Sequence, residues 1–180
     1  KLALVGAGLQ ALYHLRALTR LYSFKEIGVY GEKGSDGSIA KYWDVERKHR
    51  PTLKRHESIQ ACVRDADIVV TCTPSRRPLV SKAWIKPGAH INAIGADAQG
   101  KEELDPKLVL SSKVVADDWG QASHSGEINI PVSKNLFSRA HLCAELSEIV
   151  SGKKRGRKRS SDITIFDSTG IAALDIYFAQ

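Results

Sequence analysis

The chain begins Lys1-Leu2-Ala3-Leu4-Val5-Gly6-Ala7-Gly8-Leu9-Gln10-Ala11. An apolar run passes directly into a Gly-x-Gly-x-x-Ala pattern, and Leu12, Leu15 and Leu18 then repeat at the spacing of one helix face. A buried strand, a glycine turn and a helix in this order are typical of the phosphate site of a dinucleotide-binding fold. The alternative is a tight turn between strand and helix that binds no ligand.

Each small residue of the pattern has a physical role in such a site. Gly6 lets the chain turn tightly out of the strand, and Gly8 lets a pyrophosphate approach the backbone because it has no Cβ. Ala11 is small enough for the helix to pack against the strand. The phosphates would lie at the helix N-terminus, where free N–H groups and the positive end of the dipole favour an anion.

The length and composition indicate one domain with its own core. The chain has 180 residues, of which 42% are hydrophobic and 26% charged, as is ordinary for a globular domain. It has no apolar run as long as a membrane span and no signal-peptide pattern. The three widely spaced cysteines, Cys62, Cys72 and Cys143, are as expected for reduced residues of a cytoplasmic protein. Because the chain starts inside its first predicted strand, we expect one domain of a longer protein.

The positive charge is concentrated in one short segment. Six of the seven residues from Lys153 to Arg159 are Lys or Arg, and without them the formal net charge falls from +7 to +1. Gly152 and Gly156 favour a loop over about 152–161, and such a run is usually solvated. The rest of the chain lacks a basic face with interleaved aromatic residues, so nucleic-acid binding is not favoured.

Strands and helices are predicted to alternate along the chain. Continuous apolar strands separated by helices indicate an α/β fold of the Rossmann type, with a doubly wound, mostly parallel sheet and helices on both faces. The predicted strands are 1–5, 26–30, 52–55, 66–73, 89–94, 113–116 and 163–166, and the predicted helices are 9–22, 36–48, 58–64, 140–150 and one from about 169.

In such sheets the ligand binds at the carboxyl ends of the strands. Five predicted strands end in segments rich in Gly, Ser, Thr, Asn and Asp, which we expect to meet at one edge. These segments are Gly6–Ala11, Gly31–Lys33, Thr71–Ser75, Asn92–Asp97 and Asp167–Gly170.

The sequence leaves the form of the dinucleotide open. An acidic residue about 20 positions after the glycine turn usually binds the ribose 2′-OH of NAD, and this chain has Gly31-Glu32-Lys33 there. Glu32 would accept a hydrogen bond from the 2′-OH, whereas Lys33 would pair with the 2′-phosphate of NADP. Both cofactors fit, with a slight preference for NAD because Glu32 would repel the phosphate.

Four stretches of the chain resemble the ornithine cyclodeaminase/mu-crystallin family. The segment from His90 to Leu104 is similar to the family signature NAxG(G/A)DxPGKxEL, and Gly6–Gln10 resembles its GxGxQ turn. Ser125–Ile128 resembles the family's Gly-Glu corner. Glu145–Gly152, followed by Ile163–Gly170, resembles the closing pattern ELxxIVxG…TxFDSxG.

The resemblance implies a protein of two domains. Residues 1–170 would be the NAD(P)-binding domain, and residues 171–180 would begin a helix that returns to a substrate-binding domain, through which the whole protein forms a homodimer. Family activities include ornithine cyclodeamination, amino-acid dehydrogenation and ketimine reduction, so the implied substrate is an amino acid or an imine. The alternative is a non-catalytic NAD(P)-dependent ligand-binding protein of the mu-crystallin type.

The resemblance also assigns roles to individual residues. Asp97 is the predicted catalytic acid/base, because it follows the strand that ends near Ile94, and Thr169 would lie near the substrate. Two departures are Gly31, where NAD-using members often have Asp, and Gln99, where Pro is common. The histidines show no metal-ligand spacing, and no metal site is predicted. The predicted cofactor-binding residues are Gly6, Gly8, Leu9, Gln10, Gly31, Glu32, Lys33, Thr73, Asn92, Ile94, Lys101 and Ser168.

Overall fold

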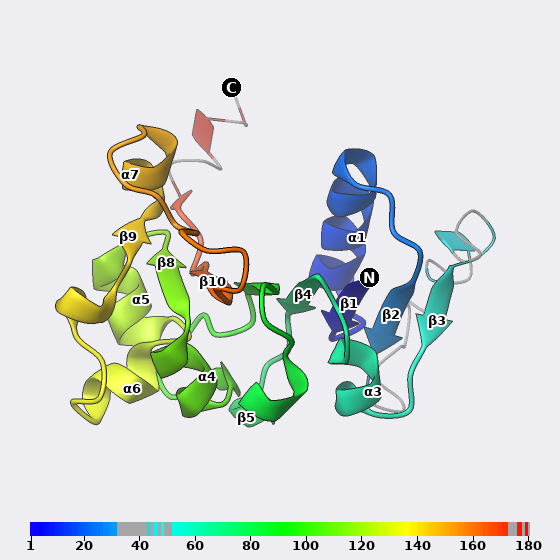
Figure 1. Cartoon of the computed structure of the whole chain (residues 1–180), viewed down its shortest axis with the longest axis horizontal. Helices are drawn as coiled ribbons and strands as arrows, with labels where there is room; N and C mark the ends of the chain where they lie inside the picture. Colours follow the sequence, from blue (N-terminus) through cyan, green and yellow to red (C-terminus); the bar gives the residue numbers. More distant parts are fainter. Residues whose placement is uncertain are drawn as a thin grey trace.

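A central parallel sheet organises the molecule (Figure 1). The computed structural model describes residues 1–31 and 52–172, and residues 43, 45, 46, 48, 176, 177 and 179 individually. The sheet has eight strands in the order β3-β2-β1-β4-β6-β10-β8-β9, and every pairing is parallel. The strands are β1 (Leu2–Val5), β2 (Ile27–Tyr30), β3 (Leu53–Arg55), β4 (Ile68–Thr71), β6 (His90–Ala93), β8 (Lys113–Ala116), β9 (Ala144–Glu145) and β10 (Thr164–Asp167).

Helices cover both faces of this sheet, as predicted. All four residues of β1 are fully buried, because alternate side chains of a strand point to opposite faces. Leu2 and Leu4 pack in the apolar cluster that holds α1 (Leu9–Leu21). Ala3 and Val5 belong to the cluster on the other face, which includes residues of α3 (Ile59–Val63), α4 (Pro106–Ser111) and α5 (Trp119–Ser125).

The structure contains short elements that the sequence patterns did not predict. A second, two-stranded parallel sheet pairs β5 (Arg76–Val80) with β7 (Glu102–Leu104). It joins the segment after β4 to the segment after β6. Also unpredicted are α4, α5, α6 (Asn129–Ser133) and the 3-10 helix η2 (Lys82–Trp84). These elements have three to seven residues, too few to show a clear hydrophobic period.

One predicted helix is wrong. The segment 140–150 is not continuous, because it contains the 3-10 helix η3 (Arg139–His141), strand β9 and helix α7 (Leu146–Val150). Ala144 and Glu145 pair with Val115 and Ala116 of β8, and this edge pairing overrides the local helical pattern. The predicted helix 36–48 lies largely outside the described residues. The helix predicted from Thr169 begins no earlier than residue 172, and most of its length also lies outside them.

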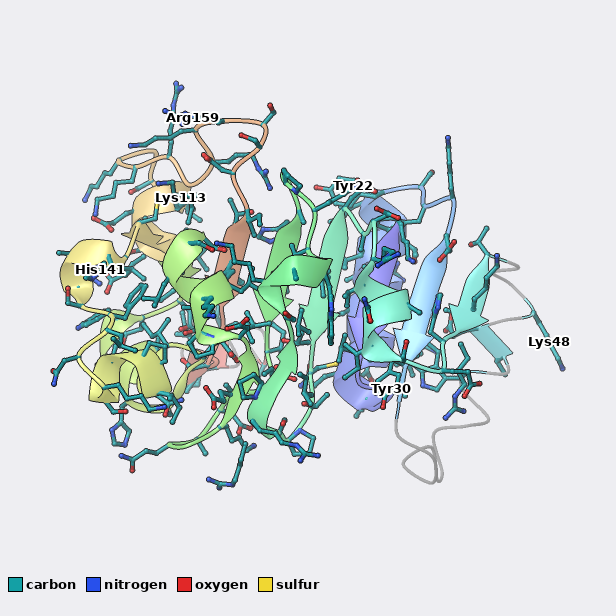
Figure 2. The ribbon with its side chains drawn as sticks, turned by 60° about the horizontal axis from the view of Figure 1, so that its bottom comes forward. Tyr22, Tyr30, Lys48, Lys113, His141 and Arg159 are labelled. Atoms are coloured by element: carbon teal, nitrogen blue, oxygen red, sulfur yellow. The ribbon has the colours of Figure 1, made fainter. Side chains whose placement is uncertain are left out.

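The basic run forms a loop between α7 and β10, and Arg157 attaches it to the sheet. The Arg157 guanidinium donates to the carbonyl of Ala89 (3.3 Å) and to the hydroxyl of Thr164 (3.0 Å). Figure 2 shows Arg159 and Lys113 at the opposite edge of the sheet from Tyr30. The loop therefore lies at the amino-terminal edge, away from the glycine turn. Within the described ranges, no helix is long and apolar enough to cross a membrane.

Candidate cofactor site

The carboxyl ends of five parallel strands share one edge of the sheet. Val5 at the end of β1 is in register with Tyr30 and with Thr71, and Ala93 is in register with Thr71 and Asp167. The predicted convergence of the polar segments is confirmed for the described residues except Asn92, which lies within β6 (His90–Ala93). Glu32 and Lys33 of the second segment lie outside them, and their predicted roles stay predictions.

The two glycines of the turn are required for different reasons. Gly6 has φ +112°, and a Cβ there would lie 2.7 Å from the carbonyl oxygen of Cys72, so the fold itself needs this glycine. Gly8 has ordinary dihedral angles, and a Cβ there would meet no atom within 4 Å. The space in front of Gly8 is therefore open, as a site for a bound group requires.

The first turn of α1 faces this space with free donors. Gly8 is the N-cap residue, and no side chain caps the helix. The first N–H groups of a helix have no partner within it, and together with the dipole they bind anions. Leu9 and Gln10 are exposed residues of this turn, and their predicted place beside a pyrophosphate stays a prediction.

A cleft of about 770 Å³ opens beside the glycine turn. Its walls are the turn itself, Tyr30 and Gly31 at the end of β2, Ile59 of α3, and residues between Cys72 and Leu79. This volume is in the range of clefts that hold small organic ligands. The open position at Gly8 and the size of the cleft fit a dinucleotide.

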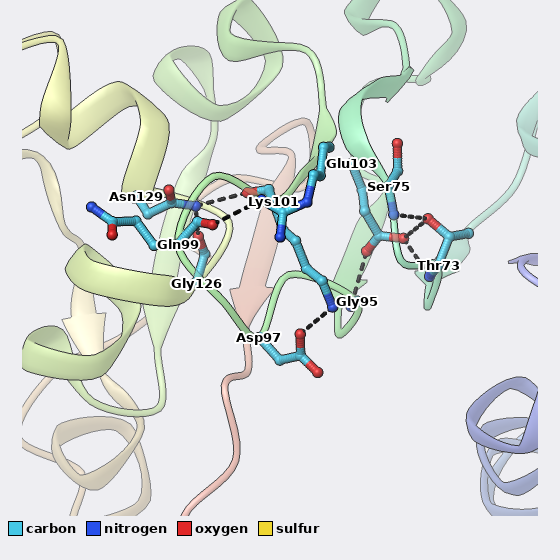
Figure 3. Close-up of polar contacts among 10 residues, drawn as sticks. Thr73, Ser75, Gly95, Asp97, Gln99, Lys101, Glu103, Gly126 and Asn129 are labelled. Atoms are coloured by element: carbon cyan, nitrogen blue, oxygen red, sulfur yellow. Dashed lines mark hydrogen bonds and ion pairs between the residues drawn. The ribbon is translucent and has the colours of Figure 1, made fainter.

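A buried carboxylate joins the segments that follow β4 and β6. Glu103 of β7 is fully buried. It accepts hydrogen bonds from the amide of Thr73 (2.6 Å), the hydroxyl of Thr73 (2.7 Å) and the amide of Gly95 (2.9 Å), as Figure 3 shows. Burial raises the pKa of Glu103, and the donated hydrogen bonds oppose this change.

Three further buried carboxylates near the same edge also accept hydrogen bonds from backbone amides. Glu127 accepts from the amides of Glu103 (2.9 Å) and Leu104 (2.6 Å), and Asp167 accepts from the amide of Glu127 (2.9 Å). Burial raises the pKa of Glu127 well above its usual range, and the charge of Glu103 adds to this effect. Burial also raises the pKa of Asp167, to about 7.

Asp117 completes the set at the end of β8. It accepts from the amides of Thr169 (2.6 Å) and Gly170 (2.8 Å), and the hydroxyl of Thr169 also donates to it. We call Glu103, Glu127, Asp167 and Asp117 the carboxylate row. Each member fixes backbone N–H groups of a segment at or near the carboxyl edge, so the row determines the shape of this half of the site.

The loop that carries Asp97 is held on both sides. Asp97 forms an ion pair with Lys101, and its side chain is 61% exposed, whereas that of Lys101 is 19% exposed. The Asn129 side chain donates to the carbonyl of Lys101 (2.7 Å) and accepts from the amide of Gly100 (2.9 Å). The predicted catalytic carboxylate therefore lies on a fixed loop beside the strand ends, with a cation as its neighbour (Figure 3).

The remaining predicted residues are not all brought to this edge. The amide of Ile94 donates to the carbonyl of Thr71 (2.9 Å), and that of Ser168 donates to Ala93 (3.0 Å), so both follow their strands at the carboxyl edge. Asn92 lies within β6, and its side chain contacts the His90 ring (3.1 Å). The structure therefore does not bring Asn92 to the edge of the site.

Sequence reasoning missed the structural role of the carboxylate row and of Asn129. Glu103 and Glu127 lie in the stretches that resemble the family, but a sequence does not show that an acidic residue is buried. The sequence signal that could have indicated burial is the position of Glu103, which directly precedes the apolar Leu104 in a short strand. Among the described residues, no group of three His, Cys, Asp or Glu side chains could hold a metal ion.

Comparisons with known proteins agree with this geometry. The model of the ornithine cyclodeaminase/mu-crystallin family matches residues 1–180. An alanine dehydrogenase from Archaeoglobus fulgidus is 39% identical over 176 residues, which are 98% of this chain and 53% of that protein.

Two solved structures are also similar. One is described as an archaeal alanine dehydrogenase dimer with bound NAD, with a TM-score of 0.90, 38% identity and coverage of 99% of this chain and 54% of that one. The other is Thermococcus litoralis Δ1-pyrroline-2-carboxylate reductase in complex with NADH and L-proline, with a TM-score of 0.90, 33% identity and coverage of 99% and 55%. The chain thus spans about half the length of these relatives, and it belongs to the ornithine cyclodeaminase/mu-crystallin family.

Proposed function

We propose that residues 1–170 form the NAD(P)-binding domain of an oxidoreductase that acts on the C–N bond of an amino acid or an imine. The observation that carries this proposal is the open space at Gly8, in front of an uncapped helix N-terminus and beside a cleft of about 770 Å³. A pyrophosphate needs such a cradle. The two similar structures hold NAD and NADH, which supports a nicotinamide cofactor here.

The rest of the site would come from outside these residues. Residues 171–180 would begin a helix that returns to a substrate-binding and dimerisation domain. Two facts support this proposal: the chain spans about half of its relatives' length, and one of the similar structures is described as a dimer. The cytoplasmic location predicted from the sequence is part of the same proposal.

In this mechanism the bound cofactor supplies the hydride acceptor or donor. The free N–H groups of α1 would hold the pyrophosphate, and Ile94 and Lys101 would flank the nicotinamide half. The carboxylate of Asp97 takes a proton from the substrate nitrogen when the C–N bond becomes C=N, and returns it in the reverse direction. The Lys101 ammonium keeps that carboxylate in place through their ion pair. Thr169 would lie near the substrate.

The proposal includes NAD or NADP, with a slight preference for NAD. Gly31 has no side chain to reach the ribose, and its carbonyl accepts a hydrogen bond from Arg55 (3.4 Å), so this position keeps NADP open. The NAD and NADH in the similar structures support the preference for NAD.

Titration calorimetry of the whole protein with NAD(H) and NADP(H) tests the cofactor proposal, and assays with a panel of amino acids, keto acids and cyclic imines test turnover. We expect binding of at least one dinucleotide and a change in NAD(P)H absorbance with one substrate class. Absence of all dinucleotide binding would overturn the proposal. Tight cofactor binding without turnover would instead identify a ligand-binding protein of the mu-crystallin type.

A further inference from the structure

The segments after β4 and β6 are joined by one side chain. The two oxygens of Glu103 divide three donors between them: Oε1 accepts from the amide and the hydroxyl of Thr73, and Oε2 accepts from the amide of Gly95. An ionised carboxylate accepts at both oxygens and donates from neither. A neutral amide of the same size has one oxygen and one NH₂ group, so it does not satisfy all three donors.

The contact between these segments leaves no free space. A Cβ at Gly95 would lie 2.2 Å from the carbonyl oxygen of Thr73 and 2.6 Å from the carboxyl carbon of Glu103. The separation of the two segments is therefore fixed by the carboxylate and by the absence of a side chain at Gly95. A change of a few tenths of an ångström in Glu103 would be passed directly to Thr73 and Gly95.

The strand order indicates which half of the cofactor would lie beside the contact of Glu103 with Thr73 and Gly95. β2 lies on one side of β1, whereas β4 and then β6 lie on the other. A dinucleotide binds across such a sheet with its pyrophosphate at the glycine turn and its adenosine ribose at the end of β2. The nicotinamide half then extends over the ends of β4 and β6, where Thr73 lines the cleft and Gly95 follows Ile94.

We propose that Glu103 is a positioning residue for the nicotinamide half of the cofactor, because its carboxylate fixes Thr73 and Gly95 at the wall that this half contacts. This inference rests on the proposed function, since the ligand is the cofactor. Glu127 positions Glu103 in turn, because it binds the amides of Glu103 and Leu104 and so orients β7.

The direct test is Glu103→Gln in the whole protein, measured by titration calorimetry with NADH and with 5′-ADP. The glutamine NH₂ would face the N–H of Gly95 or Thr73, so one buried donor loses its acceptor and that segment shifts. We expect the affinity for NADH to fall about 10- to 100-fold. The affinity for 5′-ADP, which would contact the glycine turn and the end of β2 but not Thr73 or Gly95, should stay within about twofold. In the reductive direction, the KM for NADH should rise while the KM for the imine substrate is unchanged.

Glu102→Gln is the matched control, because Glu102 is the preceding carboxylate on the same strand and is only partly buried. It should leave both affinities unchanged. Thr73→Val removes one hydroxyl donor and keeps the shape of the side chain, so it serves if Glu103→Gln does not fold. We expect Thr73→Val to lower the NADH affinity about 3- to 10-fold and to leave 5′-ADP binding unchanged.

Each outcome separates this inference from the proposed function. If the unmodified protein binds no dinucleotide, the proposed function fails. If the unmodified protein binds NADH and Glu103→Gln binds it equally well, Glu103 does not position the cofactor. An equal loss of NADH and 5′-ADP affinity would show a general structural role and would also overturn the inference.

Discussion

The two halves of the carboxyl edge are built by opposite means. At the ends of β1 and β2, Gly8 leaves open space because it has no side chain, and the backbone holds the turn through the bond from the Gly6 amide to the Tyr30 carbonyl (2.8 Å). At the ends of β6, β8 and β10, the carboxylate row fills the interior and holds the loops by their amides. One half therefore exposes backbone beside an open space, and in the other half buried side chains fix the shape of the loops.

The difference has an energetic reason. A buried carboxylate is costly unless hydrogen bonds replace its water shell, and each member of the row accepts at least two backbone or hydroxyl donors. Loops without regular secondary structure have unpaired N–H groups that need acceptors. The hydrogen bonds between the row and the loops therefore satisfy the buried carboxylates and the loop N–H groups together. They also leave Asp97 on a loop of fixed shape.

The largest expected effect is on turnover. It concerns Asp97, on the half of the carboxyl edge that the carboxylate row shapes, which we call the carboxylate half. Asp97→Asn in the whole protein should reduce turnover about 10²- to 10⁴-fold, because the substrate nitrogen loses its acid/base group. Cofactor affinity should change little, and steady-state kinetics with calorimetry would measure both. Near-normal turnover would remove Asp97 from the mechanism, whereas lost cofactor binding would make it a structural residue of the cleft.

In the half of the edge that carries the glycine turn, which we call the glycine half, substitutions at two glycines should affect different properties. Gly8 should affect cofactor binding, and Gly6 should affect folding stability. Gly8→Val should leave the melting temperature unchanged, since its Cβ has space. It should weaken NAD(P)H binding about 100-fold or more, because at least two charge-assisted hydrogen bonds to the pyrophosphate are lost. Gly6→Ala should instead cost about 1–3 kcal/mol of folding free energy, because of its positive φ and the Cys72 carbonyl. Unchanged cofactor affinity in Gly8→Val would place the site elsewhere.

The carboxylate half should also give the domain a distinctive pH dependence. The folded state raises the pKa of Asp167 to about 7, so the folded chain keeps a proton that the unfolded chain releases near pH 4. The contribution of Asp167 is therefore fully present below about pH 4 and is lost as the pH rises towards 7. The free energy of unfolding should fall over this window by up to about 1.4 kcal/mol per pH unit.

Asp167→Asn is the control for this pH dependence. Denaturant titrations between pH 4 and 8 should show a smaller slope in the variant, although its absolute stability is lower because an amide cannot accept from both Glu127 and Ile128. An identical slope in both proteins would assign the titration to another group, with Glu127 as the first candidate.

The smallest effect concerns the choice of cofactor in the glycine half. Gly31→Asp should provide an acceptor for the ribose hydroxyls and repel a 2′-phosphate, so the preference should shift towards NAD by about 1–3 kcal/mol. The ratio of the NAD and NADP dissociation constants measures this change. A constant ratio would mean that Gly31 does not face the ribose.

Most of the fold could be predicted because its signals are local. All strands of the central sheet except β9 were predicted, although β3 holds only one apolar residue, Leu53, and the predicted bounds of α1 differ from the observed Leu9–Leu21 by one residue. Segment 140–150 was mispredicted because the pairing of Ala144 and Glu145 with β8 depends on residues about 30 positions away. The small β5–β7 sheet was missed for the same reason, since it joins segments after two different strands.

The sequence by itself determined the glycine turn, the parallel α/β sheet and the edge at which its polar segments meet, because hydrophobic period and glycine position act over a few residues. Only the tertiary structure decided which acidic residues are buried. Asp97 and Glu103 are six positions apart, yet one is an exposed partner of Lys101 and the other is fully enclosed. That difference arises from long-range packing of β7 against the ends of β4 and β6, and no local pattern encodes it.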